Sequence, residues 1–152
     1  MTPVPGDYNG DGLSQLAIFR PSTGQWAIRG ESRFYYGQAE DLPVSGDYNG
    51  DGTADPAVFR PSSGLWAIRR LSRFYLGEKD DIPAPADYDG DGTADPACFR
   101  QADSRWQVLN FTRFYYGGIG DLPVPGVCNG NGTTDGAVFR GSSGLWAVRS
   151  LT

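Results

Sequence analysis

The chain has 152 residues and no histidine, and its formal net charge is −5. That charge argues against a nucleic-acid partner, because proteins hold nucleic acid by neutralising phosphates with a basic surface. No stretch reaches the length of about 18 apolar residues that a membrane span needs. With 22 glycines, 11 prolines and frequent aromatic residues, the composition favours many short strands joined by turns and predicts an all-β fold.

The sequence matches itself when it is shifted by 40 residues. One tryptophan and one arginine recur in every copy, at Trp26, Trp66, Trp106 and Trp146 and at Arg20, Arg60, Arg100 and Arg140. A constant period of this length predicts one supersecondary unit per copy, packed on its neighbours. We therefore expect one repeat domain over 1–152, built from tandem units over about 3–41, 42–81, 82–121 and 122–152.

Four strands are predicted in each complete unit. In the second unit they are 42–47, 54–60, 65–69 and 72–77, and turns rich in Gly, Pro or Asp separate them. Four short antiparallel strands in about 40 residues are typical of a β-propeller blade. The last unit has sequence for three strands only, so we expect an unpaired sheet edge there.

A nine-residue acidic segment follows the first strand of each unit. The third copy, 87–95, has aspartate at positions 1, 3, 5 and 9 and glycine at positions 4 and 6. Calcium takes six to eight oxygen ligands, and alternating carboxylates with one backbone carbonyl supply most of them. Asp, Asn and Gly also occur in ordinary turns, which is the alternative interpretation.

The four copies differ in how many oxygen donors they keep. Gln15 replaces the ninth aspartate in the first copy, and Val127 replaces the first aspartate in the fourth. Since affinity rises with ligand charge, we expect Ca²⁺ to fill two to four sites in the order third, second, first, fourth. Hydrogen bonds alone could hold the fourth loop. The expected ligands are Asp7, Asn9, Asp11 and Leu13; Asp47, Asn49, Asp51, Thr53 and Asp55; Asp87, Asp89, Asp91, Thr93 and Asp95; and Asn129, Asn131, Thr133 and Asp135.

These loops, repeated every 40 residues and followed by Ala-Val-Phe-Arg-Pro as at 57–61, resemble the FG-GAP and VCBS class of repeats. The resemblance covers essentially the whole chain. It implies blades of a calcium-binding β-propeller, as in integrin α subunits, bacterial secreted or surface proteins and at least one fungal lectin. It also implies calcium in the loop between the first and second strands, whereas Gln15 and Val127 depart from the family pattern.

The recurring tryptophans are expected to pack between neighbouring sheets, as aromatic rings commonly do. Tyr36 and Tyr116, which Leu76 replaces in the second copy, are expected to be partly exposed. The arginines that end the second strand could pair with aspartates and tie one unit to the next. The residues that could bind a ligand are Tyr36, Tyr116, Arg33, Arg73 and Arg113.

Catalysis has little support in this sequence. The lack of histidine removes the common nucleophile–base pairs and zinc sites. The clustered aspartates are already explained as cation ligands, so we expect no enzymatic activity. Cys98 and Cys128 replace recurring residues in consecutive copies, and they are either a compensating disulfide or two unpaired thiols.

Two functions are expected from the sequence. The first is a calcium-stabilised, noncatalytic binding or adhesion module for a glycan or protein ligand, at the cell surface or outside the cell, where weak calcium sites stay filled. The second is a structural building block that self-assembles into a larger ring or filament through its unpaired terminal unit. The second predicts a homo-oligomer.

Overall fold

The computed structural model describes residues 1–150, which form fifteen short β-strands and no helix. The predicted all-β fold is therefore confirmed. No helix in this range could cross a membrane.

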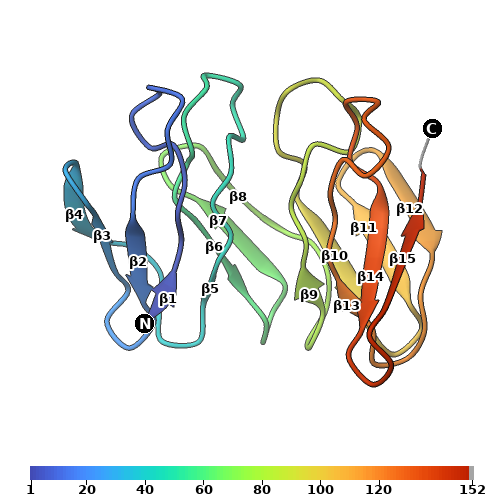
Figure 1. The fold of residues 1–152 in the computed structure, drawn as a ribbon. Helices are drawn as coiled ribbons and strands as arrows, with labels where there is room; N and C mark the ends of the chain where they lie inside the picture. The colour runs from blue at the N-terminus through green and yellow to red at the C-terminus, as the bar shows by residue number, and fades with distance from the viewer. Residues whose placement is uncertain (151–152) are drawn as a thin grey trace. The chain divides into compact units, whose positions relative to one another are not determined.

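Each repeat forms one antiparallel sheet in which the strands follow one another in chain order (Figure 1). The last sheet has three strands among the described residues, as predicted. The first sheet contains β1 (Thr2–Pro3), β2 (Ala17–Arg20), β3 (Gln25–Ile28) and β4 (Ser32–Tyr35). The second contains β5 (Leu42–Pro43), β6 (Ala57–Arg60), β7 (Leu65–Ile68) and β8 (Ser72–Tyr75). The third contains β9 (Ile82–Pro83), β10 (Ala97–Arg100), β11 (Arg105–Val108) and β12 (Thr112–Tyr115), and the fourth contains β13 (Leu122–Pro123), β14 (Gly136–Arg140) and β15 (Leu145–Arg149).

The first strand of each sheet is shorter than predicted. The sequence predicts a strand over 42–47, but β5 covers two residues and a single bridge between Gly46 and Asp55 follows it. Proline at the second strand position has no N–H to donate, and the chain then turns into the acidic loop. The bridge between Gly46 and Asp55 therefore closes the base of the acidic loop.

The chain forms two compact units. The first unit is Met1–Tyr75 and holds the first and second sheets, and the second begins at Leu76 and holds the third and fourth. Each sheet is a meander of consecutive antiparallel strands, the connectivity of a propeller blade.

Within the first unit, the two sheets pack through opposite faces. Strand register places Phe19, Trp26 and Phe34 on one face of the first sheet, which we call its tryptophan face. Val58 and Ala67 of the second sheet pack against that face and share a buried cluster with Trp26. Their side of the sheet, opposite to its own tryptophan, is called the valine face.

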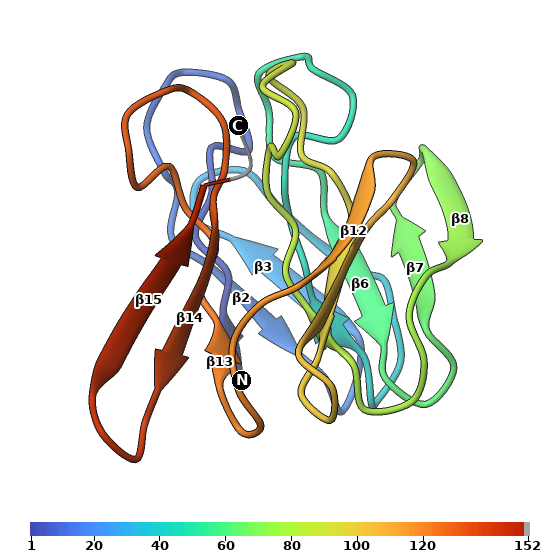
Figure 2. The ribbon, with the colours of Figure 1, turned by 90° about the vertical axis from the view of Figure 1, so that its right-hand side faces the viewer.

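The second unit repeats this packing. Phe99, Trp106 and Phe114 form the tryptophan face of the third sheet. Val138 belongs to the same buried cluster, and Ala147 packs against it. Figure 2 gives a second view of β13, β14 and β15, which supply that valine face. One inter-sheet contact therefore occurs in both units.

The prediction that the tryptophans pack between sheets is confirmed for Trp26 and Trp106 and is wrong for Trp146. Trp26, Trp66 and Trp106 are fully buried, whereas Trp146 is 64% exposed. Trp146 lies on the tryptophan face of the fourth sheet, opposite the face that covers the third. Its neighbours on β14 and β15 do not bury it.

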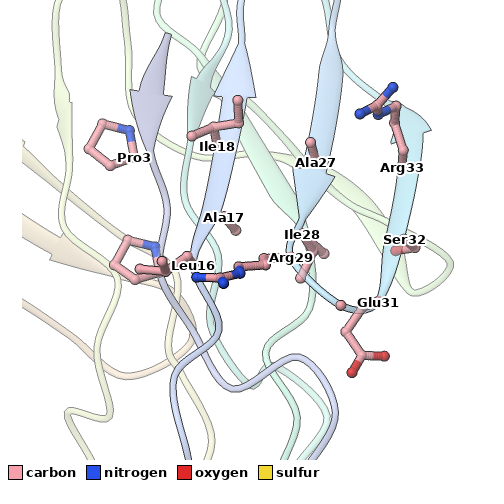
Figure 3. A pocket seen from close by; sticks show the side chains of 12 residues that line it. Pro3, Leu16, Ala17, Ile18, Ala27, Ile28, Arg29, Glu31, Ser32 and Arg33 are labelled. Atoms are coloured by element: carbon pink, nitrogen blue, oxygen red, sulfur yellow. The ribbon is translucent and has the colours of Figure 1, made fainter.

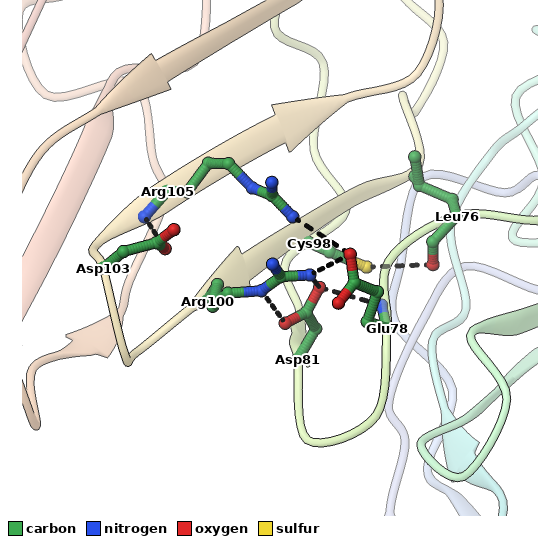
Figure 4. Close-up of polar contacts among 7 residues, drawn as sticks. All are labelled: Leu76, Glu78, Asp81, Cys98, Arg100, Asp103 and Arg105. Atoms are coloured by element: carbon green, nitrogen blue, oxygen red, sulfur yellow. Dashed lines mark hydrogen bonds and ion pairs between the residues drawn. The ribbon is translucent and has the colours of Figure 1, made fainter.

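Three of the four recurring arginines pair with aspartates that the sequence reading did not name. We call the segment that leads from the last strand of one sheet to the first strand of the next the connector. Each connector ends at a buried aspartate, which an arginine binds through Nε and an NH₂ group. The pairs are Asp41 with Arg60, Asp81 with Arg100, and Asp121 with Arg140. Figure 4 shows the Arg100 pair, which Glu78 extends at 2.9 Å. Such bidentate pairs tie the connector to the second strand of the next sheet. Arg20 instead contacts the Met1 sulfur at 3.7 Å.

Candidate functional site: acidic loops and inter-sheet pockets

The four acidic loops share one backbone frame. We call them loops 1 to 4, over 7–15, 47–55, 87–95 and 127–135. Their paired glycines all have positive φ, between 74° and 89°. Residues with a Cβ rarely adopt this conformation, so glycine at positions 4 and 6 is a requirement of the turn. Loops 1 and 2 lie side by side at one end of the first unit, as do loops 3 and 4 in the second (Figure 1).

The first aspartate holds the turn together in loops 1 to 3. In loop 3, the two oxygens of Asp87 accept hydrogen bonds from the N–H groups of Gly90 and Gly92, at 2.7 and 2.9 Å. Asp7 and Asp47 make the same pair of bonds. In loop 4 the corresponding residue is Val127, which is 52% exposed and offers no side-chain acceptor. The first carboxylate therefore supports the turn as well as supplying oxygen.

Loop 3 gathers carboxylates around one point. Oxygens of Asp87, Asp89 and Asp95 lie within 4.8 Å of one another, the one such acidic trio among residues 1–150. Asp91 turns one oxygen to the N–H and hydroxyl of Thr93, at 2.7 and 2.5 Å. Three convergent carboxylates are a donor set that suits a calcium ion.

Loop 1 has the same frame but a different centre. The amide nitrogen of Gln15 donates to Asn9 Oδ1 at 3.1 Å, Asp11 Oδ1 at 3.4 Å and the Leu13 carbonyl at 2.8 Å. These three oxygens belong to residues expected to bind calcium. The Gln15 amide thus occupies, with hydrogen bonds, the oxygens that a cation would need in loop 1.

Loops 2 and 4 lie between these extremes. In loop 2, Asn49 directs its amide nitrogen to Asp55 Oδ1 at 3.5 Å, and Asn49 Oδ1 accepts from the Asp51 N–H. In loop 4, the Asn129 amide bridges Asp135 Oδ1 and the Ser150 hydroxyl, at 3.1 and 3.0 Å. Loop 4 is thus closed by hydrogen bonds within the chain.

The ninth residue plays a common role in all four loops. Its side-chain oxygen accepts the backbone N–H of the second loop residue, whether the ninth residue is Gln15, Asp55, Asp95 or Asp135. Burial raises the pKa of Asp95 above its ordinary value, and the nearby charges of Asp89 and Asp91 add to that effect. Burial also raises the pKa of Asp55. The ionised form of these carboxylates is therefore disfavoured without a cation.

A pocket lies between the sheets of the first unit. Its volume is about 360 Å³, and its lining includes Tyr35 and Tyr36, Asp41 and Arg60 of the connector pair, and Arg73. Burial raises the pKa of the Tyr36 phenol, and Arg73 opposes this effect through a hydrogen bond and its charge. The pocket therefore combines aromatic surface with guanidinium and hydroxyl groups.

The second unit has an equivalent pocket of about 450 Å³. Seven lining residues of the two pockets correspond at a spacing of 80 residues: Tyr35 and Tyr115, Tyr36 and Tyr116, Gly37 and Gly117, Asp41 and Asp121, Val58 and Val138, Arg60 and Arg140, and Ala67 and Ala147. Gly37 has a φ of 99°, and a Cβ there would lie 3.1 Å from Val58. Glycine thus lets the connector pass close to the valine face.

The structure brings together some of the predicted ligand residues and separates others. Tyr36 and Tyr116 are half-buried, as predicted, and each lines one pocket. Arg73 joins Tyr36, but Arg33 lines a different hollow on the outside of the first sheet. Arg113 lies beside Phe114 and Arg149, away from Tyr116.

Two pocket tyrosines were missed in the sequence. Tyr35 and Tyr115 are 69% and 61% exposed at the ends of β4 and β12. The Phe-Tyr-Tyr run in copies one and three is the signal that could have found them, because each lies directly before a tyrosine that was predicted. Asp41 and Asp121 could have been found from their recurrence before each first strand.

No disulfide joins Cys98 and Cys128. Cys98 is buried and its Sγ lies 3.5 Å from the Leu76 carbonyl oxygen, whereas Cys128 is exposed. The disulfide considered for this pair is absent from the structure. Cys98 instead packs as a small hydrophobic residue at the position of Val58 and Val138.

Comparison of the chain with protein-family models, with curated proteins and with solved structures finds no match. Functional inference therefore rests on the loops and pockets themselves.

Proposed function

We propose that this chain is a calcium-stabilised, noncatalytic module that binds carbohydrate outside the cell, through the pockets between the sheets of each unit. As part of this proposal, the four repeats belong to the FG-GAP and VCBS class that they resemble. The convergence of Asp87, Asp89 and Asp95 within 4.8 Å supports the calcium part. The equivalence of the two pockets supports the binding part.

Calcium would act as a structural ion. In loop 3, Asp87, Asp89 and Asp95 would hold it with the other oxygen of Asp91 and the Thr93 carbonyl. The ion supplies positive charge at a place where burial and neighbouring carboxylates raise the pKa of Asp95. Loop 2 is the second candidate. The Asn49 amide, which directs its nitrogen to Asp55, would have to rotate to turn its oxygen inward. The hydrogen-bonded centres of loops 1 and 4 favour two ions per chain.

The pockets have the composition of a sugar-binding site. Exposed Tyr35 and Tyr115 provide flat apolar surface for the C–H face of a pyranose ring. Arg73 and the Tyr36 hydroxyl provide donors and an acceptor for sugar hydroxyl groups. The adjacent Asp41 is already paired with Arg60, so the pocket carries no unpaired carboxylate pair suited to glycoside cleavage.

Thermal melts with and without calcium test the first part. We expect calcium at millimolar concentration to raise Tm and EDTA to reverse the shift, because an ion that binds only the folded state stabilises it. Magnesium at equal concentration is the control, since it demands a tighter octahedral shell. An unchanged Tm after EDTA treatment would show that the loops do not bind calcium.

A glycan array followed by calorimetry tests the second part. We expect two sugar sites per chain, one in each pocket. Arg73→Met with Tyr36→Phe should remove one of them, because Tyr116 and Arg140 of the other pocket are unchanged. Tyr75→Phe, which removes an exposed hydroxyl outside both pockets, is the matched control. Absence of glycan binding by the calcium-treated protein would contradict the carbohydrate proposal while leaving the calcium result intact.

A further inference from the structure

The outer face of the first sheet is an apolar surface that no part of its own unit covers. It forms a hollow of about 940 Å³ lined from all four strands, including Pro3, Ile18, Ala27 and Arg33 (Figure 3). This is the valine face of the first sheet, because Ile18 and Ala27 occupy the positions of Val58 and Ala67. Ile18 is 37% exposed, whereas Val58 is 3% exposed.

The complementary surface is the tryptophan face of the fourth sheet. Trp146 is 64% exposed there, whereas Trp26 and Trp106, which a valine face covers within their own units, are 0% exposed. Leu122 and Val148 add further exposed apolar surface. The chain therefore presents both halves of a contact that it already makes once in each unit.

Backbone and loop contacts accompany that packing in each unit. The Ala54 N–H donates to the Asp7 carbonyl at 2.6 Å, and the Thr134 N–H donates to the Asp87 carbonyl at 2.8 Å. The corresponding donor on the first sheet is Ser14, which is exposed. The corresponding acceptor on the fourth sheet is the carbonyl of Val127, a residue that is also exposed.

The loop glycines show the same complementarity. The γ-methyl of Thr133 lies 2.9 Å from where a Cβ on Gly90 would be. In the first unit, the γ-methyl of Thr53 lies 3.2 Å from where a Cβ on Gly10 would be. Around Gly130 of loop 4 the corresponding space is open. Leu13, 70% exposed in loop 1, occupies the position of Thr53 and Thr133 and could fill that space.

We propose that a second copy of this chain docks the valine face of its first sheet onto the tryptophan face of the fourth sheet. Ile18 and Ala27 would cover Trp146, Leu13 would pack over Gly130, and the Ser14 N–H would bond the Val127 carbonyl. The two surfaces differ, so the contact is heterologous and builds closed rings or open filaments. This assembly is independent of the sugar pockets.

Light scattering or sedimentation across a concentration series, in millimolar calcium, tests the proposal. We expect the mass to rise with concentration from 16.4 kDa toward its multiples. Ile18→Glu and Trp146→Glu should each weaken association at least about tenfold, because each places a charge or removes an anchor at an apolar contact. Ile119→Glu, at an 84% exposed connector position, should leave the mass unchanged.

A mixture of the two variants gives the decisive result. Ile18→Glu retains a working fourth sheet and Trp146→Glu a working first sheet, so an equimolar mixture should form a one-to-one complex that grows no further. Ile18→Ser and Trp146→Ser replace any glutamate variant that fails to fold by circular dichroism. The calcium-dependent Tm shift, measured on the same variants, keeps failure of assembly distinct from failure of calcium binding.

Three outcomes overturn the proposal. The wild-type chain could remain at 16.4 kDa at every concentration, whether Trp146 stays exposed to solvent or is buried by closure within one chain. The variants could associate as tightly as the wild type. The mixture could stay monomeric while the wild type associates.

Discussion

Loops 1 and 3 have the same backbone conformation, but the polar groups at their centres differ. Each places two glycines in the left-handed region and holds them through its first aspartate. In loop 3 the centre is three carboxylates, and in loop 1 it is the Gln15 amide, which donates to three oxygens. The residue at the ninth position therefore decides whether a carboxylate or an amide donor faces the centre of the loop.

The largest expected effect comes from giving loop 3 the centre of loop 1. Asp95→Gln keeps the acceptor for the Tyr88 N–H and introduces an amide toward Asp89 and Asp91. We expect this variant to lose most of the calcium-induced stabilisation contributed by loop 3. That loss is about 2.7 kcal/mol at calcium a hundredfold above Kd, or about 5–10 °C in Tm for a chain of this size.

Calorimetric melts with calcium and with EDTA measure this loss. Asp80→Asn is the matched control, because it removes one carboxylate outside the loops at a residue with φ of 69°, which asparagine tolerates. A calcium shift in Asp95→Gln equal to that of the wild type would place the ion elsewhere.

The reverse substitution should have the next largest effect. Gln15→Asp removes three amide hydrogen bonds in loop 1 and adds a charge near Asp11. We expect the calcium-free protein to lose about 1–2 kcal/mol and calcium to restore it. Titration calorimetry should then count one more ion per chain.

Gln15→Leu separates the two contributions of that substitution. It also removes the amide bonds but offers no oxygen, so the lost stability should not return with calcium. Equal recovery of both variants in calcium would contradict the assignment of position nine as a ligand.

Loop 4 tests the first position rather than the ninth. Val127→Asp should supply the acceptor that Asp7 gives to the glycine N–H groups of loop 1. We expect a gain of about 1 kcal/mol, the usual net value of a hydrogen bond, measurable by urea unfolding without calcium. Val127→Asn should gain less, because its side chain has one acceptor oxygen where aspartate has two. A loss of stability in Val127→Asp would mean that the turn of loop 4 does not need this acceptor.

The 40-residue period made most of the fold predictable. Most strands, turns and loop glycines recur in four copies, so local signals that are weak in one copy become firm in four. The position of the missing strand followed from the same alignment. Loop 3 was identified as the most acidic centre because carboxylate spacing is a property of the sequence.

The parts that escaped prediction depend on where side chains point. The Gln15 amide fills its loop only because its longer side chain can keep the Tyr8 bond while turning nitrogen inward. Trp146 is exposed because it lies on the face away from the third sheet, and repetition of the residue says nothing of which neighbours exist. Tyr35 lines the same pocket as Tyr36, which depends on how the chain turns after the end of β4.

The smallest expected effect is a difference in pH response between the two loops in EDTA. Burial raises the pKa of Asp95 in the folded chain. A raised pKa means that its stabilising contribution is present below the unfolded pKa of about 3.9 and is lost as pH rises through the folded value. Asp95→Asn should therefore stabilise the calcium-free protein slightly at neutral pH, by less than about 1 kcal/mol for a partly exposed group.

Asp7 in loop 1 should respond in the opposite direction. Burial acts to raise its pKa, but hydrogen bonds from the N–H groups of Gly12, Gly10, Asn9 and Asp11 outweigh that effect and lower it. Its contribution is thus present above about pH 3.9 and is lost as pH falls through the folded pKa. Asp7→Asn should destabilise the protein at neutral pH, and the difference from wild type should shrink in acid. Tm measured from pH 7 to pH 3 in EDTA gives both curves. Parallel curves for the two variants would contradict the opposite pKa shifts of Asp7 and Asp95.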